Sequence, residues 1–149
     1  MNAENYLLEL EKELLDNDNF QEIKLTNDWV SRIPNEPGVY VLKEKSTIIY
    51  VGETGSLSAR MKDLLDSRHH SVRRTLGQKL FSNHKDFSQA TIRSKFPVEI
   101  EGLLDKYIIN NISLAIKVTT IGRKELEERI ENKIVKESKL NKRGKRKSF

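Results

Sequence analysis

The 149-residue sequence contains no cysteine, which excludes disulfides and thiolate metal sites. No apolar run approaches the roughly 20 residues that cross a membrane, and no signal-peptide pattern opens the chain. A chain without disulfides suits a reducing compartment. From these absences we expect a soluble, cytoplasmic protein.

Internal repeats are also absent, and this length suits one domain with a core of its own. Hydrophobic residues make up 36% and charged residues 33% of the chain, which is typical of a globular domain rather than a disordered one. The net charge of +5 is unevenly distributed, because residues 1–25 are acidic whereas 68–79 and 139–147 are basic. An acidic first segment has the wrong sign for contacting a polyanion, and the two basic segments have the right one.

Two short runs of β-branched and aromatic residues, 39–42 and 47–51, have the composition of strands. The polar residues between them predict a hairpin that turns around Lys45. In this hairpin we expect Tyr40 to lie opposite Tyr50, with both phenols on one face. A core does not require two polar-tipped rings on one face, because each buried hydroxyl needs a partner. The pattern therefore indicates a functional face.

Apolar residues recur at helical spacing in five other segments and alternate as in a strand in one. The predicted helices are a first one ending near Asn17 and then 57–65, 72–80, 100–109 and 124–136, and the predicted strand is 114–119. Ser56 is the predicted N-cap of the helix at 57–65, which places Arg60 close to the end of the second hairpin strand. We expect a loop at 82–97, with at most one helical turn.

The run Gly38-Val39-Tyr40, the run Tyr50-Val51-Gly52 and the following Arg60 together resemble the GIY-YIG endonuclease family. Its members also carry a glutamate on a later helix, often in the pattern E-x-x-L-I, and an asparagine further on. Glu131 and Asn141 resemble these two. The resemblance implies an α+β fold with a small three-stranded antiparallel sheet flanked by helices, here with an extra N-terminal helix. It also implies hydrolysis of DNA phosphodiester bonds with one divalent metal ion.

The resemblance covers roughly residues 37–141, and it suggests a division of the chain into three parts. We expect a helical extension packed on the core at 1–35, the nuclease-like domain at 36–141 and a basic tail at 142–149. No zinc finger or other appended recognition domain is visible in the sequence. This favours a small stand-alone nuclease with a role in restriction or in DNA processing.

The chemistry of phosphodiester hydrolysis fits these residues. It needs an activated water, stabilisation of phosphoryl charge and help for the leaving oxygen. Tyr40 or Tyr50 would orient or deprotonate the water, and Arg60 would bind phosphate oxygens with its forked guanidinium. Glu131 would hold one Mg²⁺ or Mn²⁺ ion, since magnesium commonly binds through one carboxylate, several waters and the substrate phosphate. The predicted catalytic residues are thus Tyr40, Tyr50, Arg60 and Glu131.

The choice of Glu131 rests on the helix predicted at 124–136. At about 100° per residue, Glu131 and Glu127 fall within its apolar arc, whereas Glu125 and Glu128 fall outside. A carboxylate on the buried side is costly unless it is paired or holds a metal. Glu131 also has the family-like spacing to the apolar pair that follows, so Glu127 is the second candidate.

Contacts to DNA are predicted from the basic segments, since they favour binding to phosphates independently of sequence. The predicted DNA-binding residues are Arg73, Arg74, Asn141, Lys142 and Arg143.

Two departures from the family pattern leave questions open. Many relatives have a histidine or tyrosine four residues after the arginine, where this chain has Leu64, so the proton donor is His69, His70 or neither. Relatives also tend to have a proline shortly before the asparagine that Asn141 resembles, and this chain does not. The alternative function is therefore a non-catalytic or weakly catalytic DNA-binding module that keeps the fold.

Overall fold

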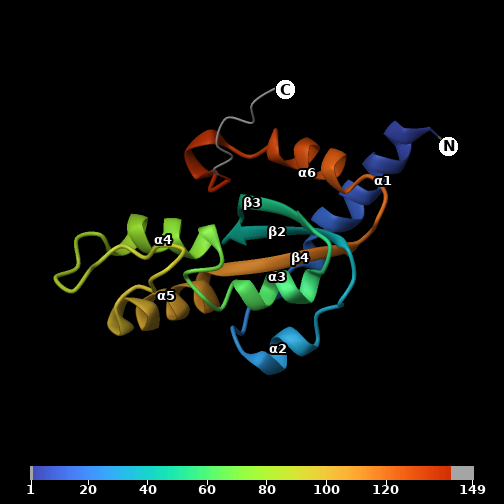
Figure 1. Ribbon diagram of the computed structural model, residues 1–149. Coiled ribbons are helices and arrows are strands. Elements are labelled where there is room, and N and C mark those ends of the chain that lie inside the picture. The colour runs from blue at the N-terminus through green and yellow to red at the C-terminus, as the bar shows by residue number, and fades with distance from the viewer. Residues whose placement is uncertain (1, 142–149) are drawn as a thin grey trace.

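An antiparallel four-stranded sheet in the order β1-β4-β2-β3 organises the fold of the computed structural model, which describes residues 2–141 (Figure 1). The elements follow one another as α1 (Ala3–Leu15), η1 (Asn17–Asn19), β1 (Gln21–Glu22), α2 (Asn27–Ser31), β2 (Gly38–Glu44), β3 (Thr47–Thr54), α3 (Leu57–Asp63), α4 (Ser71–Phe81), α5 (Val98–Asn111), β4 (Ile112–Val118), α6 (Arg123–Glu131) and η2 (Lys136–Ser138).

The α+β class is confirmed, but the prediction of a three-stranded sheet is wrong. The fourth strand is β1, whose two residues pair with Leu114 and Ser113 of β4. A strand of two residues shows no alternating pattern, so periodicity could not reveal it. The polypeptide before the hairpin therefore contributes a strand to the sheet as well as helices.

Helices cover both faces of the sheet (Figure 1). On one face, α1 and α6 enclose an apolar cluster that includes Leu14 and Ile130 together with Val41 and Val51 from the strands. On the other face, α2, α3, α4 and α5 enclose a larger cluster, which contains Tyr40. The two clusters define an α6 face and a tyrosine face of the sheet.

All five predicted helices are present, as α1, α3, α4, α5 and α6, and α3 begins at the predicted N-cap. Ser56 is its N-cap, with Oγ accepting a hydrogen bond from the backbone N–H of Ala59 at 3.2 Å. The segment 82–97 contains neither helix nor strand, as predicted. None of the helices in the described range is long and apolar enough to cross a membrane.

The last helix ends earlier than predicted, at Glu131 rather than near residue 136. The apolar residues beyond this helix belong to different clusters: Ile134 packs on the α6 face and Leu140 on the tyrosine face. One straight helix cannot reach both faces of a sheet. The chain instead passes the edge strand β3, where the N–H of Leu140 donates to the carbonyl of Ile49 at 2.7 Å.

Candidate active site

A β-bulge in the β2–β3 hairpin places Tyr40 and Tyr50 on the same face of the sheet. The pairing shifts by one residue after the turn, so that Leu42 pairs with Tyr50 rather than with Ile49. In the unshifted register Tyr50 would pair with Val41 and share the α6 face with it, because directly opposed residues point to the same side. The extra residue of the bulge reverses this orientation.

The rings of Tyr40 and Tyr50 are neighbours, with centroids 5.8 Å apart, but they are not directly opposed. Tyr40 pairs with Gly52, so the predicted pairing of the two tyrosines is wrong, whereas their shared face is confirmed. A Cβ atom on Gly52 would lie 2.5 Å from Cζ of Tyr40, closer than real Cβ contacts. Glycine at this position therefore leaves the space that the Tyr40 ring occupies.

The hydroxyl of Tyr40 is the centre of the cluster. It lies 3.0 Å from Nε2 of His70 and accepts a hydrogen bond from Nε of Arg60 at 3.3 Å. Tyr40 is 1% exposed. Burial, reinforced by the neighbouring Tyr50, raises the pKa of Tyr40 well above its usual value of 10.0, although Arg60 acts in the opposite direction. Tyr40 is thus a protonated phenol at neutral pH.

His70 is buried, and the start of α4 fixes its ring. It is the N-cap of α4, and its Nδ1 accepts a hydrogen bond from the N–H of Val72 at 3.2 Å. Burial, together with Arg60 and other nearby arginines, lowers the pKa of His70 well below 6.5, so the ring is neutral. A neutral imidazole that accepts at Nδ1 carries its hydrogen on Nε2. His70 therefore donates to the oxygen of Tyr40.

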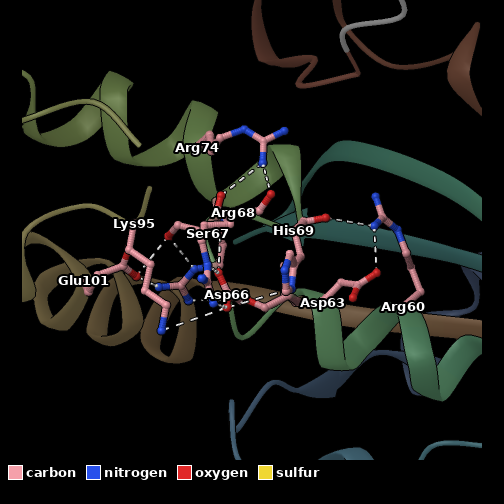
Figure 2. A network of polar contacts seen from close by, with 11 residues as sticks. Arg60, Asp63, Asp66, Ser67, Arg68, His69, Arg74, Lys95 and Glu101 are labelled. Carbon is pink, nitrogen blue, oxygen red and sulfur yellow. Dashed lines mark hydrogen bonds and ion pairs between the residues drawn. The ribbon is translucent and has the colours of Figure 1, made fainter. Parts of the chain in front are cut away.

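Arg60 connects this centre to the loop before α4. Its Nη1 donates to Oδ2 of Asp63 at 3.1 Å and to the carbonyl of His69 at 3.2 Å, as Figure 2 shows. With Nε on Tyr40, the guanidinium is held on three sides. A guanidinium fixed in this way is preorganised to present its remaining N–H groups to a phosphate.

The structure thus brings together Tyr40, Tyr50, Arg60 and His70. Sequence reasoning left the role of His70 open, because the resemblance points to Leu64, which is 1% exposed and part of the core. One feature of the sequence does favour His70. It lies directly before a segment with the apolar periodicity of a helix, a position where side chains cap the helix and are held rigidly. That its ring reaches Tyr40 depends on how α4 packs.

Glu131 comes from α6, and neighbouring residues of that helix pack on the α6 face. Its Oε2 forms an ion pair with Nζ of Lys139 at 2.9 Å, and its side chain is 13% exposed. Glu127 is also buried, and its Oε2 accepts a hydrogen bond from the N–H of Glu53 at 3.0 Å. The prediction that both glutamates lie on the buried side is confirmed. Within residues 2–141, no group of three or more histidine and acidic side chains could hold a metal.

Arg73, one of the predicted DNA-binding residues, is buried in α4, which argues against that prediction. Its side chain is 1% exposed and forms ion pairs with Glu101 and with Asp105, the latter at 2.6 Å. Nε also donates to Oγ of Ser67 at 3.0 Å. The apolar periodicity of α4 did not predict the burial of Arg73, because the carboxylates that make a buried arginine tolerable come from α5. Arg73 is not accessible to a phosphate.

Asn141 is bound to the edge of the sheet. Its Oδ1 accepts from the N–H of Val51 at 3.0 Å, and its Nδ2 donates to the carbonyl of Val51 at 2.7 Å. The amide satisfies both backbone groups of one β3 residue, which would otherwise be exposed at an edge. The other predicted DNA-binding residues of this segment, Lys142 and Arg143, lie outside the described residues.

Comparisons with known proteins agree with the α+β fold. The model of the GIY-YIG catalytic domain matches residues 20–147, and the chain belongs to this family. A stretch of 51 residues is 41% identical to UvrABC system protein C of Rhizobium meliloti (strain 1021). That stretch covers 34% of this chain and only 8% of the relative. No solved structure matches. Membership of the family indicates a nuclease-type function and, in general, the use of a divalent metal ion.

Proposed function

We propose that this protein is a metal-dependent endonuclease that hydrolyses phosphodiester bonds in DNA. The observation that carries the proposal is the convergence of two side chains from separate helices on one phenol oxygen of the sheet. Arg60 and His70 both reach the hydroxyl of Tyr40, with Tyr50 beside it. Buried polar groups that converge with perturbed pKa values are a general mark of catalytic sites.

Arg60 binds the scissile phosphate in this proposal. Tyr40, Asp63 and the His69 carbonyl engage Nε and Nη1, and within the described residues no hydrogen bond occupies Nη2. The charge of a guanidinium persists at all working pH values, so it stabilises the negative charge that develops on the phosphoryl oxygens. Removal of one such group typically costs about 10²–10³-fold in rate.

The two phenols have different roles. Tyr50 is the more exposed of the pair and orients the attacking water. Tyr40 accepts hydrogen bonds from Arg60 and His70, which leaves its own O–H to donate toward Tyr50 or the bound water. His70 donates at Nε2 and accepts at Nδ1, so its neutral ring has no vacant nitrogen to take up a proton. It orients Tyr40 rather than acting as the base.

Glu131 is the residue that would hold the metal. It offers the hard oxygen ligands that Mg²⁺ or Mn²⁺ prefers, and the position facing one of its oxygens already holds a cation, the ammonium group of Lys139. One carboxylate suffices, because magnesium usually retains several waters. When bound, the ion supplies Lewis-acid stabilisation of charge on the phosphate. We expect one ion per site and a cytoplasmic location. We also expect a helical extension at 1–35, a nuclease domain at 36–141 and a basic tail at 142–149.

A plasmid-cleavage assay with magnesium tests the proposal. Wild type should nick or linearise DNA, chelation should stop the reaction, and Arg60→Ala and Glu131→Ala should each reduce the rate by at least about 10²-fold. Arg32→Ala is the control, because this α2 cap residue has a side chain that is 77% exposed. Cleavage unaffected by Glu131→Ala would refute only the assignment of Glu131 as the metal ligand.

The alternative is a DNA-binding module without strong catalysis. It is favoured by the ion pair of Glu131 with Lys139 and by the core position of Leu64. This alternative predicts DNA binding by the wild type with no metal-dependent cleavage of duplex or single-stranded DNA. That result would refute the nuclease proposal.

A further inference from the structure

A surface pocket of about 310 Å³ lies along α4, the helix whose N-cap is His70. Its lining includes Ser71, which follows His70 in the chain, so the pocket and the proposed active site share the N-terminal end of α4. All but one of its lining residues have polar side chains; the lining residues are Ser71, Arg74, Thr75, Gln78, Gln89 and Ala90. This volume is at the lower end of the range for small-ligand sites, about 300–1,000 Å³, and suits a single base or phosphate.

Arg74 supplies the positive charge of this pocket. Its Nη1 donates to the carbonyls of Ser67 at 3.1 Å and Arg68 at 2.8 Å. Figure 2 shows that both bonds leave one nitrogen, while the rest of the guanidinium points away from these two residues. In the part of the chain that the structure describes, no hydrogen bond engages Nε or Nη2. The side chain is therefore held rigidly with one edge available to an anion.

The position of Arg74 relates the pocket to the active site. Its charge lies close enough to His70 to lower the pKa of that ring, as does the charge of Arg60. Arg60 of α3 and Arg74 of α4 thus both place a guanidinium group in the neighbourhood of His70. Two such groups from different helices suit successive phosphates of one nucleic-acid strand.

Two side-chain amides give the pocket the chemistry that reads a base edge. Gln78 is exposed in the last turn of α4. Gln89 comes from the 82–97 loop, where its Nε2 donates to the carbonyl of Ala90 at 3.0 Å and approaches that of Arg74 at 3.5 Å. These bonds fix the loop against α4 and leave Oε1 of Gln89 as an acceptor. The amide of Gln78 can donate and accept together, which is how glutamine selects adenine, whereas Gln89 adds only an acceptor.

We infer that this pocket is a nucleotide subsite for DNA next to the scissile phosphate. Arg74 binds the phosphate of that nucleotide, and Gln78 and Gln89 contact the edge of its base. The inference rests on the proposed function for the identity of the ligand. Its consequence is a base preference at one position beside the cut, whereas the other proposed DNA contacts are to phosphates.

The phosphate contact is tested by fluorescence anisotropy with a short labelled DNA duplex, in EDTA and over a range of salt concentrations. Arg74→Ala should weaken binding about tenfold and reduce the slope of log K against log salt by about one. Arg32→Ala is the matched control because it removes an arginine of α2. Equal slopes and affinities for the two variants would overturn the phosphate contact. Circular dichroism verifies that each variant is folded.

The base contact is tested by selection of bound duplexes from a random-sequence pool, also in EDTA. Wild type should enrich one base at one position, and Gln78→Ala should reduce that enrichment about fivefold or more. Gln78 is exposed on the helix surface, so alanine there leaves the core intact. A wild type without preference, or a variant with an unchanged one, would overturn the base contact. Both measurements exclude metal, so they can succeed where the plasmid-cleavage assay fails, and the reverse also holds.

Discussion

The hydroxyl of Tyr40 lies 3.0 Å from Nε2 of His70, which joins the middle of the sheet to the N-terminus of α4. Both side chains are almost fully buried. Because the N–H of Val72 occupies Nδ1 of the ring, the Nε2 hydrogen points at the phenol. The capping of a helix and the orientation of a proposed catalytic tyrosine thus depend on the same imidazole.

His70→Asn should separate these two roles. Asparagine is a good N-cap but is too short to reach Tyr40, so α4 should form while the contact to the phenol is lost. We expect DNA cleavage to fall by about 10- to 100-fold, which corresponds to one lost hydrogen bond to a buried polar group. His84→Asn is the control, since His84 lies in the loop at 82–97 and has no role in the proposed site. Equal rates for the two variants would contradict the positioning role of His70.

The low pKa of His70 predicts a specific dependence of stability on pH. The folded protein keeps this ring neutral, whereas the unfolded chain takes up a proton below the usual pKa of 6.5. The unfolded state then binds more protons, so stability falls as the pH drops from about 6.5 toward 5, by up to about 1.4 kcal/mol per pH unit. Urea unfolding across this range should show that the stability difference between wild type and His70→Asn narrows as the pH falls. In His84→Asn the wild-type dependence should persist.

Gly52→Ala should disturb the site directly. The added methyl group would meet the Tyr40 ring at 2.5 Å, so the ring or the strand must shift. Overpacking of this kind typically costs about 1–3 kcal/mol. Gly55→Ala is the matched control, because a Cβ atom there meets nothing within 4 Å. We expect a lower unfolding midpoint and slower DNA cleavage for Gly52→Ala alone, and similar values for the two variants would contradict the close approach.

Arg73→Met should strongly destabilise the fold without a direct effect on DNA binding. It leaves Glu101 and Asp105 without the buried guanidinium, and breaking a buried ion pair by removal of one partner costs about 3–5 kcal/mol. Substitution of the two carboxylates as well, by Glu101→Gln and Asp105→Asn, should recover part of the loss. Urea unfolding measures both effects. A single variant as stable as wild type would show that the network contributes little.

Lys139→Met tests whether the ammonium group competes with a metal at Glu131. The two cations would share one carboxylate, so loss of the lysine should lower the magnesium concentration that gives half-maximal cleavage, by several fold. Lys136→Met, an exposed lysine of η2, should leave it unchanged. Calorimetric titration of magnesium gives the same comparison without DNA. An unchanged or higher requirement in Lys139→Met would contradict competition.

The sequence was a reliable guide where one element carries its own pattern. Helix α3 begins at a capping serine, and the loop at 82–97 has no apolar period, so local rules sufficed for both. Predictions from the sequence were wrong where the burial of a residue or the end of a helix depends on contacts with another segment of the chain. Arg73 is buried only because α5 supplies two carboxylates, and α6 ends early because Leu140 packs on the other face of the sheet.

The amino-acid sequence by itself determined the strand composition of the hairpin, the motif that contains Tyr40, Tyr50 and Arg60, and the family to which the chain belongs. The tertiary structure alone decided which of the two adjacent histidines meets the phenol, and it decided the register of the tyrosines. Both depend on relations between distant segments: a one-residue bulge sets which face Tyr50 occupies, and the packing of α4 against the sheet brings His70 to Tyr40.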